Sequence, residues 1–172
     1  MKEYLMVDGY NIINQWEELR EESRHSLDSA RIKLLDIMSN YQAFKGVKVI
    51  VVFDAHYVKN SMEKHEFYNA VEVVYTKEFE SADNYIERFV ADHYSDDNTI
   101  RVATSDSLEQ MVVLGLGAAR ISARELKTQI QEASQKMDKN HINMMKHDRN
   151  LLEHHLDPIV AKKLESIRRQ KS

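Results

Sequence analysis

The stretch Tyr4-Leu5-Met6-Val7-Asp8-Gly9-Tyr10-Asn11 decides the fold of this chain. Four apolar or aromatic residues run into an aspartate, a glycine and an asparagine, which predicts a buried strand over residues 4–7 with a tight exit. In a parallel sheet, ligands bind in the crevice beyond the carboxyl ends of the strands. The sequence therefore places Asp8 at the rim of a candidate site, on a rigid element.

Two more apolar runs end in the same way. Residues 49–53 (Val-Ile-Val-Val-Phe) run into Asp54, and residues 99–105 (Thr-Ile-Arg-Val-Ala-Thr-Ser) run into Asp106. Because the carboxyl ends of parallel strands meet at one edge of a sheet, we expect these acids to lie close to Asp8. Their convergence is the main functional signal in the sequence.

Helical patterns alternate with these strands. Apolar residues spaced three and four apart predict an amphipathic helix over residues 27–44. Other helices are predicted over 12–19, 80–93, 107–114 and 122–136 and from 158 onward, with strands at 71–75 and 118–121, and with loops at 20–26 and at 55–69, where a short helix is an alternative. The alternation predicts an α/β fold, a three-layer α/β/α sandwich with a mostly parallel central sheet.

Composition limits the class of protein. The chain has 172 residues, a formal charge of -4 and no cysteine, which excludes disulfides and thiolate metal sites. No apolar run reaches the roughly 20 residues that span a bilayer, and the first residues lack the apolar stretch of a signal peptide, so we expect a soluble cytoplasmic protein. Because a negative net charge repels phosphate at long range, any RNA must be held by local patches.

A cluster of carboxylates needs a cation. If Asp8, Asp54, Asp83 and Asp106 converge, like charges within a few ångströms disfavour joint ionisation. Oxygen ligands without cysteine favour Mg²⁺ or Mn²⁺ over zinc. Such an ion activates water and neutralises charge on a phosphoryl group, so the pattern indicates phosphodiester hydrolysis. The side chains expected to orient the ligands or a water are Asn11, Glu80, Ser81 and Ser105.

Each acid also has a structural interpretation. An aspartate that follows a strand commonly caps a turn or a helix. Asp106 and Glu109 are spaced like a capping pair. Glu80 has the alternative of an ordinary surface charge near a helix start.

Five motifs follow one another in a specific order. They are residues 7–13 (Val-Asp-Gly-Tyr-Asn-Ile-Ile) with Trp16, 52–56 (Val-Phe-Asp-Ala-His), 74–78 (Val-Tyr-Thr-Lys-Glu), 81–87 (Ser-Ala-Asp-Asn-Tyr-Ile-Glu) and 102–106 (Val-Ala-Thr-Ser-Asp). Together they resemble the YacP-like NYN-domain proteins, a branch of the PIN-like ribonucleases. Residues 122–126 continue the resemblance, which reaches to about residue 135.

The resemblance implies a metal-dependent endoribonuclease in which Asp8, Asp83 and Asp106 are catalytic and Asp54 is a further metal ligand. It also implies that the target is mRNA and that the protein acts on the ribosome. Ser81 stands where the family pattern has threonine, and the hydroxyl is kept. We expect a NYN/PIN-like nuclease domain at 1–136 and a C-terminal helical extension of the same domain at 137–172.

Two regions mix groups that suit contact with RNA. The predicted loop 55–69 combines cations with aromatic rings, which suits stacking on unpaired bases and contact with phosphate, and an ordinary solvated loop is the alternative. The C-terminal helix ends in a basic string, for which a solvated helix end is the alternative. The candidate RNA contacts are Arg31, His56, Lys59, Lys64, Lys162, Lys163, Arg168 and Arg169.

A second function class stays open on the residues alone. It is a non-catalytic adaptor that binds RNA or the ribosome and whose acids are structural. Two other classes are disfavoured. A phosphoacceptor receiver domain needs a lysine at the end of a late strand, and residues 118–121 supply none. A haloacid-dehalogenase-type phosphatase needs an aspartate two residues after the first, where Tyr10 stands.

Overall fold

The computed structural model describes residues 1–55, 59–155 and 158–170. The chain divides into two compact units, Met1–Ala133 and Ser134–Ser172. The first unit contains a sheet and the helices that cover it. The second contains the later part of α6 (Ala123–His155) together with α7 (Pro158–Gln170). That residues 137–172 are an extension of the domain at 1–136 stays a prediction.

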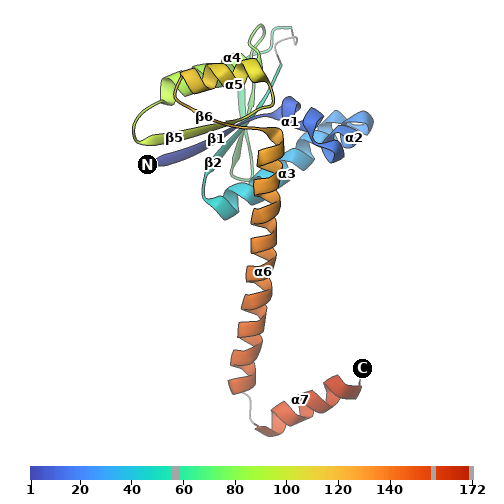
Figure 1. The fold of residues 1–172 in the computed structure, drawn as a ribbon. Coiled ribbons are helices and arrows are strands. Elements are labelled where there is room, and N and C mark those ends of the chain that lie inside the picture. The colour runs from blue at the N-terminus through green and yellow to red at the C-terminus, as the bar shows by residue number, and fades with distance from the viewer. Residues whose placement is uncertain (56–58, 156–157, 171–172) are drawn as a thin grey trace. The chain divides into compact units, whose positions relative to one another are not determined.

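The sheet of the first unit has six strands in the order β3-β4-β2-β1-β5-β6 (Figure 1). The strands are β1 (Lys2–Asp8), β2 (Lys48–Phe53), β3 (Lys64–Tyr68), β4 (Val71–Tyr75), β5 (Asn98–Ala103) and β6 (Ala119–Ile121). Every neighbouring pair is parallel except β3 with β4. The predicted α/β fold with a mostly parallel sheet is confirmed.

Helices cover both faces of this sheet, as Figure 1 shows. One face carries α1 (Gly9–Gln15), α2 (Glu17–His25), α3 (Leu27–Lys45) and the start of α6, and the other carries α4 (Ala82–His93) and α5 (Ser107–Gly115). Side chains alternate along a strand. Leu5 and Val7 of β1 therefore pack on the face covered by α1, α2, α3 and α6, while Tyr4 and Met6 pack on the face covered by α4 and α5. The predicted three layers are present.

The register of the central strands brings the predicted acids to one edge. Asp8 lies opposite Val52 of β2, and Val7 lies opposite Ala103 of β5. Asp54 and Asp106 follow those two strands closely along the chain, at the same edge as Asp8.

The helix predicted over 12–19 is wrong in its continuity. It is interrupted at Trp16, whose extended backbone (φ −88°, ψ 121°) ends α1. A second helix, α2, then covers residues 17–25 and so includes most of the segment 20–26 that was predicted as a loop. The indole N–H of Trp16 donates to the carbonyl oxygen of Ala123 at 2.8 Å in the buried core. The interruption of the helix at Trp16 thus coincides with a hydrogen bond to a residue 107 positions further along the chain.

Two further predictions of local structure are corrected. Residues 64–68, expected as loop, form strand β3, which is exposed along most of its length and pairs with β4 at the edge of the described sheet. The helix predicted to end near 136 continues as α6 to His155. No helix in the described part of the chain combines the length and apolarity needed to cross a membrane.

Candidate active site

Three aspartates from separate parts of the chain line one pocket at the carboxyl edge of the sheet. Its volume is about 430 Å³. The residues that line it are Asp8, Tyr10, Asn11, Asp54, Ser81, Ala82 and Asp83. The fold thus brings together the exits of β1 and β2 and the start of α4.

Asp8 is the most perturbed of these acids. It ends β1 and caps α1, with its Oδ1 accepting a hydrogen bond from the Asn11 N–H at 3.3 Å, and it is 9% exposed. Burial raises the pKa of its carboxyl to about 7 against the lowering effect of that hydrogen bond, and the nearby charges of Asp83 and Asp54 add to the rise. Asp8 therefore resists ionisation unless positive charge is close.

Asp54 and Asp83 are connected through the start of α4. Oδ2 of Asp54 accepts a hydrogen bond from the N–H of Ala82, the first residue of α4, at 3.4 Å. Ser81 caps this helix, with Oγ accepting from the N–H of Asn84 at 3.2 Å. Asp83 consequently lies in the first helical turn, where the helix dipole favours negative charge.

Gly9 lets the exits of β1 and β2 approach each other. A Cβ atom on Gly9 would lie 2.4 Å from Cε1 of the buried Phe53 ring. Only glycine fits between that ring and the backbone. The packing of the Phe53 ring, next to Asp54, therefore requires glycine at position 9, next to Asp8.

Asn11 and Ser105 link the end of β5 to the pocket. Oδ1 of Asn11 accepts a hydrogen bond from the Ser105 N–H at 2.9 Å, and Oγ of Ser105 accepts from the Ala123 N–H at 3.4 Å. The N–H of Asp106 donates to Oγ1 of the buried Thr104 at 3.2 Å. The backbone of Asp106 is thus held at the site edge, but its side chain is exposed and is not among the described residues that line the pocket.

Glu80 is held by an arginine of α4. Because α4 begins at Ala82, Glu80 precedes the helix that it was expected to open. Its Oε1 accepts hydrogen bonds from Nε and Nη2 of Arg88 at 3.1 and 3.0 Å, and the same Nη2 also donates to Glu63 at 2.7 Å. Its Oε2 is buried and has no hydrogen-bond partner within the described residues. Glu80 does not line the pocket of the three aspartates.

The donors of this pocket fit a hard divalent cation in their chemistry. They include three carboxylates and an amide, which are oxygen donors that Mg²⁺ and Mn²⁺ prefer. Within residues 1–55, 59–155 and 158–170, no group of three or more histidine, aspartate or glutamate side chains is arranged so that it could hold a metal ion. The fit rests instead on Asp8, a buried carboxyl beside two other acids whose ionisation a cation would favour.

Tyr10 is a pocket residue that the sequence analysis missed. Its hydroxyl accepts a hydrogen bond from Nη1 of Arg31 at 2.8 Å, and Arg31 also pairs with Asp28. Arg31, a predicted RNA contact, therefore reaches a residue that lines the pocket. The available signal was position, since Tyr10 stands in the strand exit two residues after Asp8.

The two other predicted RNA contacts that the structure describes in the first unit, Lys59 and Lys64, are not among the residues that line the aspartates' pocket. Lys64 pairs with Glu66, and its Nζ lies 5.9 Å from the centre of the Tyr75 ring. Lys59 is exposed, and His56 is outside the described residues. The remaining four, Lys162, Lys163, Arg168 and Arg169, are exposed on α7 in the second unit.

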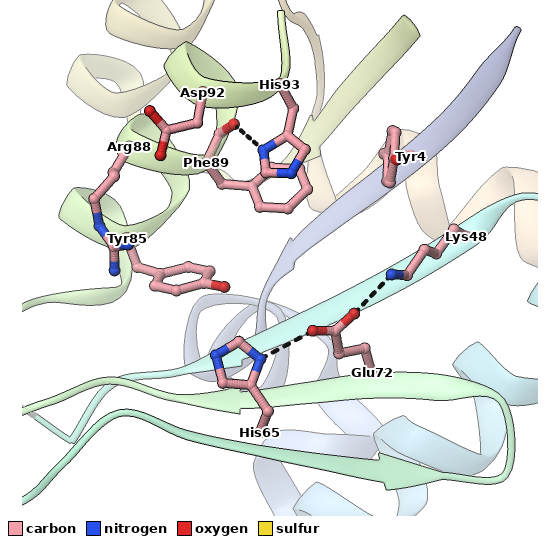
Figure 2. Close-up of a pocket in the computed structure, with 9 residues that line it drawn as sticks. All are labelled: Tyr4, Lys48, His65, Glu72, Tyr85, Arg88, Phe89, Asp92 and His93. Carbon is pink, nitrogen blue, oxygen red and sulfur yellow. Dashed lines mark hydrogen bonds and ion pairs between the residues drawn. The ribbon is translucent and has the colours of Figure 1, made fainter.

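A second pocket, of about 250 Å³, opens between α4 and the strands (Figure 2). The ring nitrogens of His65 lie 2.8 Å from Glu63 and 2.9 Å from Glu72, so the ring donates to both carboxylates when it is protonated. These bonds raise the pKa of His65. Glu72 also pairs with Lys48 at 2.8 Å. The charged side chains of this second pocket pair with one another. The pocket lined by the three aspartates is therefore the better candidate for a hydrolytic site.

Comparison with known proteins gives consistent matches. Residues 5–169 match the family model of the YacP-like NYN domain. The uncharacterized protein YacP of Bacillus subtilis strain 168 is 42% identical over 135 residues, which is 78% of this chain and 79% of that protein. A crystal structure of Rae1 (YacP) from Bacillus subtilis aligns with a TM-score of 0.72 and 38% identity over 96% of this chain and 94% of that one. A mutant crystal structure of the same protein gives 0.73 and 32% over 95% and 99%.

Proposed function

The chain belongs to the YacP-like NYN domain family, a PIN-like nuclease family, and on this premise we propose that it is a divalent-metal-dependent endoribonuclease. The observation that carries the proposal is the single pocket in which Asp8, Asp54 and Asp83 meet. The reaction is hydrolysis of RNA phosphodiester bonds. We propose mRNA as the substrate and the ribosome as a place of action, and the family resemblance is the support for both.

The proposed cofactor is Mg²⁺ or Mn²⁺, held by Asp8, Asp54 and Asp83, with Asp106 as a further ligand at the end of β5. When bound, the ion activates water and neutralises charge on the phosphoryl oxygens. With a pKa raised to about 7, the carboxyl of Asp8 is about half protonated at neutral pH, and a bound cation would favour its ionised form.

Backbone N–H groups and side chains next to the acids hold this arrangement in place. Asn11 fixes Asp8 through its N–H and the β5 exit through its Oδ1. Ser81 fixes the start of the helix that carries Asp83, and the N–H of Ala82 fixes Asp54. The proposed catalytic residues are Asp8, Asp83 and Asp106. Asn11, Ser81 and Ser105 are positioning residues.

A cleavage assay tests this function directly. The purified chain is expected to cut a single-stranded RNA at internal positions when Mg²⁺ or Mn²⁺ is present, and to stop when EDTA removes the metal. Labels at the 5′ end and, separately, at the 3′ end distinguish internal cuts from trimming on a denaturing gel. RNA that is bound but never cut with either metal would contradict the proposal and support the non-catalytic adaptor.

A further inference from the structure

Phe79 combines two unusual properties. Its side chain is 85% exposed, and its backbone adopts a left-handed conformation with φ +66°. Bulky residues rarely take this conformation, because Cβ then crowds the backbone. Because the ring is exposed, its burial contributes little free energy to offset this backbone strain. Strain of this kind at the edge of a site is grounds for a functional hypothesis.

The position of Phe79 connects it to the acidic pocket. Phe79 lies two residues before Ser81, which lines that pocket. Since consecutive Cα atoms are about 3.8 Å apart, the backbone of Phe79 lies within about 8 Å of that of Ser81. The backbone of Phe79 therefore lies close to the rim of the candidate active site, and its ring is exposed to solvent there.

The loop that carries Phe79 is held in place by its neighbours. The N–H of Glu78 donates to the carbonyl oxygen of Ser61 at 2.8 Å, and the N–H of Glu80 donates to that of Lys77 at 3.1 Å. Oε2 of Glu78 accepts from the N–H of Asn60 at 2.8 Å. Two loops at the carboxyl edge of the sheet thus brace each other, and a braced loop presents its exposed ring in a defined place.

Cations and a second apolar side chain lie on the same two loops. Met62, which follows Ser61, is 82% exposed. Lys77 and Lys59 are exposed on the same pair of loops. Beside a pocket of aspartates in a chain of net charge -4, nearby lysines are needed to offset the repulsion of phosphate. An exposed aromatic ring next to cations is the pattern that holds single-stranded nucleic acid.

We propose that Phe79 stacks on an unpaired RNA base next to the phosphate at the acidic pocket, and that Lys77 contacts an adjoining phosphate. This inference rests on the function proposed above. It makes unpaired RNA the substrate form at this site, because a base inside a duplex does not offer its face to a ring. Stacking tolerates any sequence, since every base has a π face.

The test compares two single strands of about 12 nucleotides, within the site size of single-strand binding folds. One is oligoadenylate, and the other has the same sugars and phosphates but no bases. Affinity of the full chain is measured by fluorescence anisotropy in EDTA, so that no strand is cut. We expect Phe79→Ala to weaken binding of oligoadenylate by roughly 5- to 100-fold and binding of the base-free strand by less than about twofold.

Three further variants keep the test interpretable. Phe79→Gly removes the ring and relieves the left-handed strain, so it should fold at least as well as the wild type and bind like Phe79→Ala. Phe79→Trp should retain binding. Phe67→Ala is the matched control, because Phe67 is 70% exposed on the edge strand β3, and it should leave both affinities within about twofold.

Lys77→Ala gives a different pattern. It should weaken both strands equally and lower the slope of log affinity against log salt by about 1, since it removes a phosphate contact. Equal losses on both strands for the Phe79 variants would overturn the inference. So would a wild-type chain that shows no preference for the strand with bases, including one that binds neither.

The outcomes separate this inference from the proposed function. A chain that cuts RNA while Phe79→Ala binds oligoadenylate like the wild type remains a nuclease and refutes the stacking. A chain that never cuts, but loses base-dependent affinity in Phe79→Ala, refutes the nuclease and supports the stacking.

Discussion

Asp83→Asn is expected to lower the rate of RNA cleavage by at least about 100-fold, the scale on which removal of a single electrostatic contact in an active site acts. Asp83 lines the pocket from the first turn of α4, and asparagine there keeps the shape of the side chain but removes its charge. The cap of α4 by Ser81 is untouched, so the fold should persist. Single-turnover cleavage rates with Mn²⁺ measure the loss, and circular dichroism checks the fold.

The same helix offers a matched control. Asp92 is an exposed acid in the last turn of α4, and Asp92→Asn should cut at close to the wild-type rate. Asp106→Asn is expected to lie between the two, because its side chain does not line the pocket. Wild-type cleavage by Asp83→Asn would show that the acids of this pocket are structural.

Asp8→Asn is expected to stabilise the metal-free protein at alkaline pH. The pKa of Asp8 is about 7 in the folded protein and 3.8 in an ordinary carboxyl. Below pH 3.8 both the folded and the unfolded chain keep this proton, and Asp8 costs no stability. As pH rises to 7 the unfolded chain ionises first, so the free energy of unfolding falls by about 1.4 kcal/mol per pH unit.

Above pH 7 both states are ionised and the cost stays near its maximum of about 4 kcal/mol. Asparagine cannot ionise, and it caps a helix about as well as aspartate. Urea unfolding in EDTA should therefore show Asp8→Asn more stable than the wild type at pH 8 by up to about 4 kcal/mol, with the difference vanishing toward pH 4. The exposed Asp96 supplies the control, since Asp96→Asn should show no such trend. If the stability difference between Asp8→Asn and the wild type did not change with pH, the raised pKa of Asp8 would not be its cause.

The acids that sequence reasoning located best are those whose position follows from strand topology. Asp8 and Asp54 each follow a buried apolar run, and parallel pairing of β1 with β2 brings such exits together. Asp106 shows the limit of this argument. Topology places its backbone at the right edge, but the direction of its side chain depends on the turn held by Thr104.

Tertiary contacts explain most of what could not be predicted. The helix is interrupted at a tryptophan, Trp16, and not at a glycine or proline that the sequence would have marked. The interruption coincides with the hydrogen bond from Trp16 to Ala123. Strand β3 reads Lys-His-Glu-Phe-Tyr, without an apolar alternation, because it is an exposed edge stabilised by pairing with β4. The left-handed backbone of Phe79 leaves no mark in the residue types around it, so the base-stacking candidate emerged only from the structure.

One measurement tests the central claim most directly, namely that the pocket of Asp8, Asp54 and Asp83 holds a divalent metal ion. Crystals of the wild type and of Asp83→Asn soaked in Mn²⁺ would be compared by anomalous diffraction at the manganese edge. We expect a peak within about 2.0–2.6 Å of carboxylate oxygens of the pocket in the wild type, and a weaker peak or none in the variant. Manganese bound only elsewhere, or bound equally by the variant, would contradict the account.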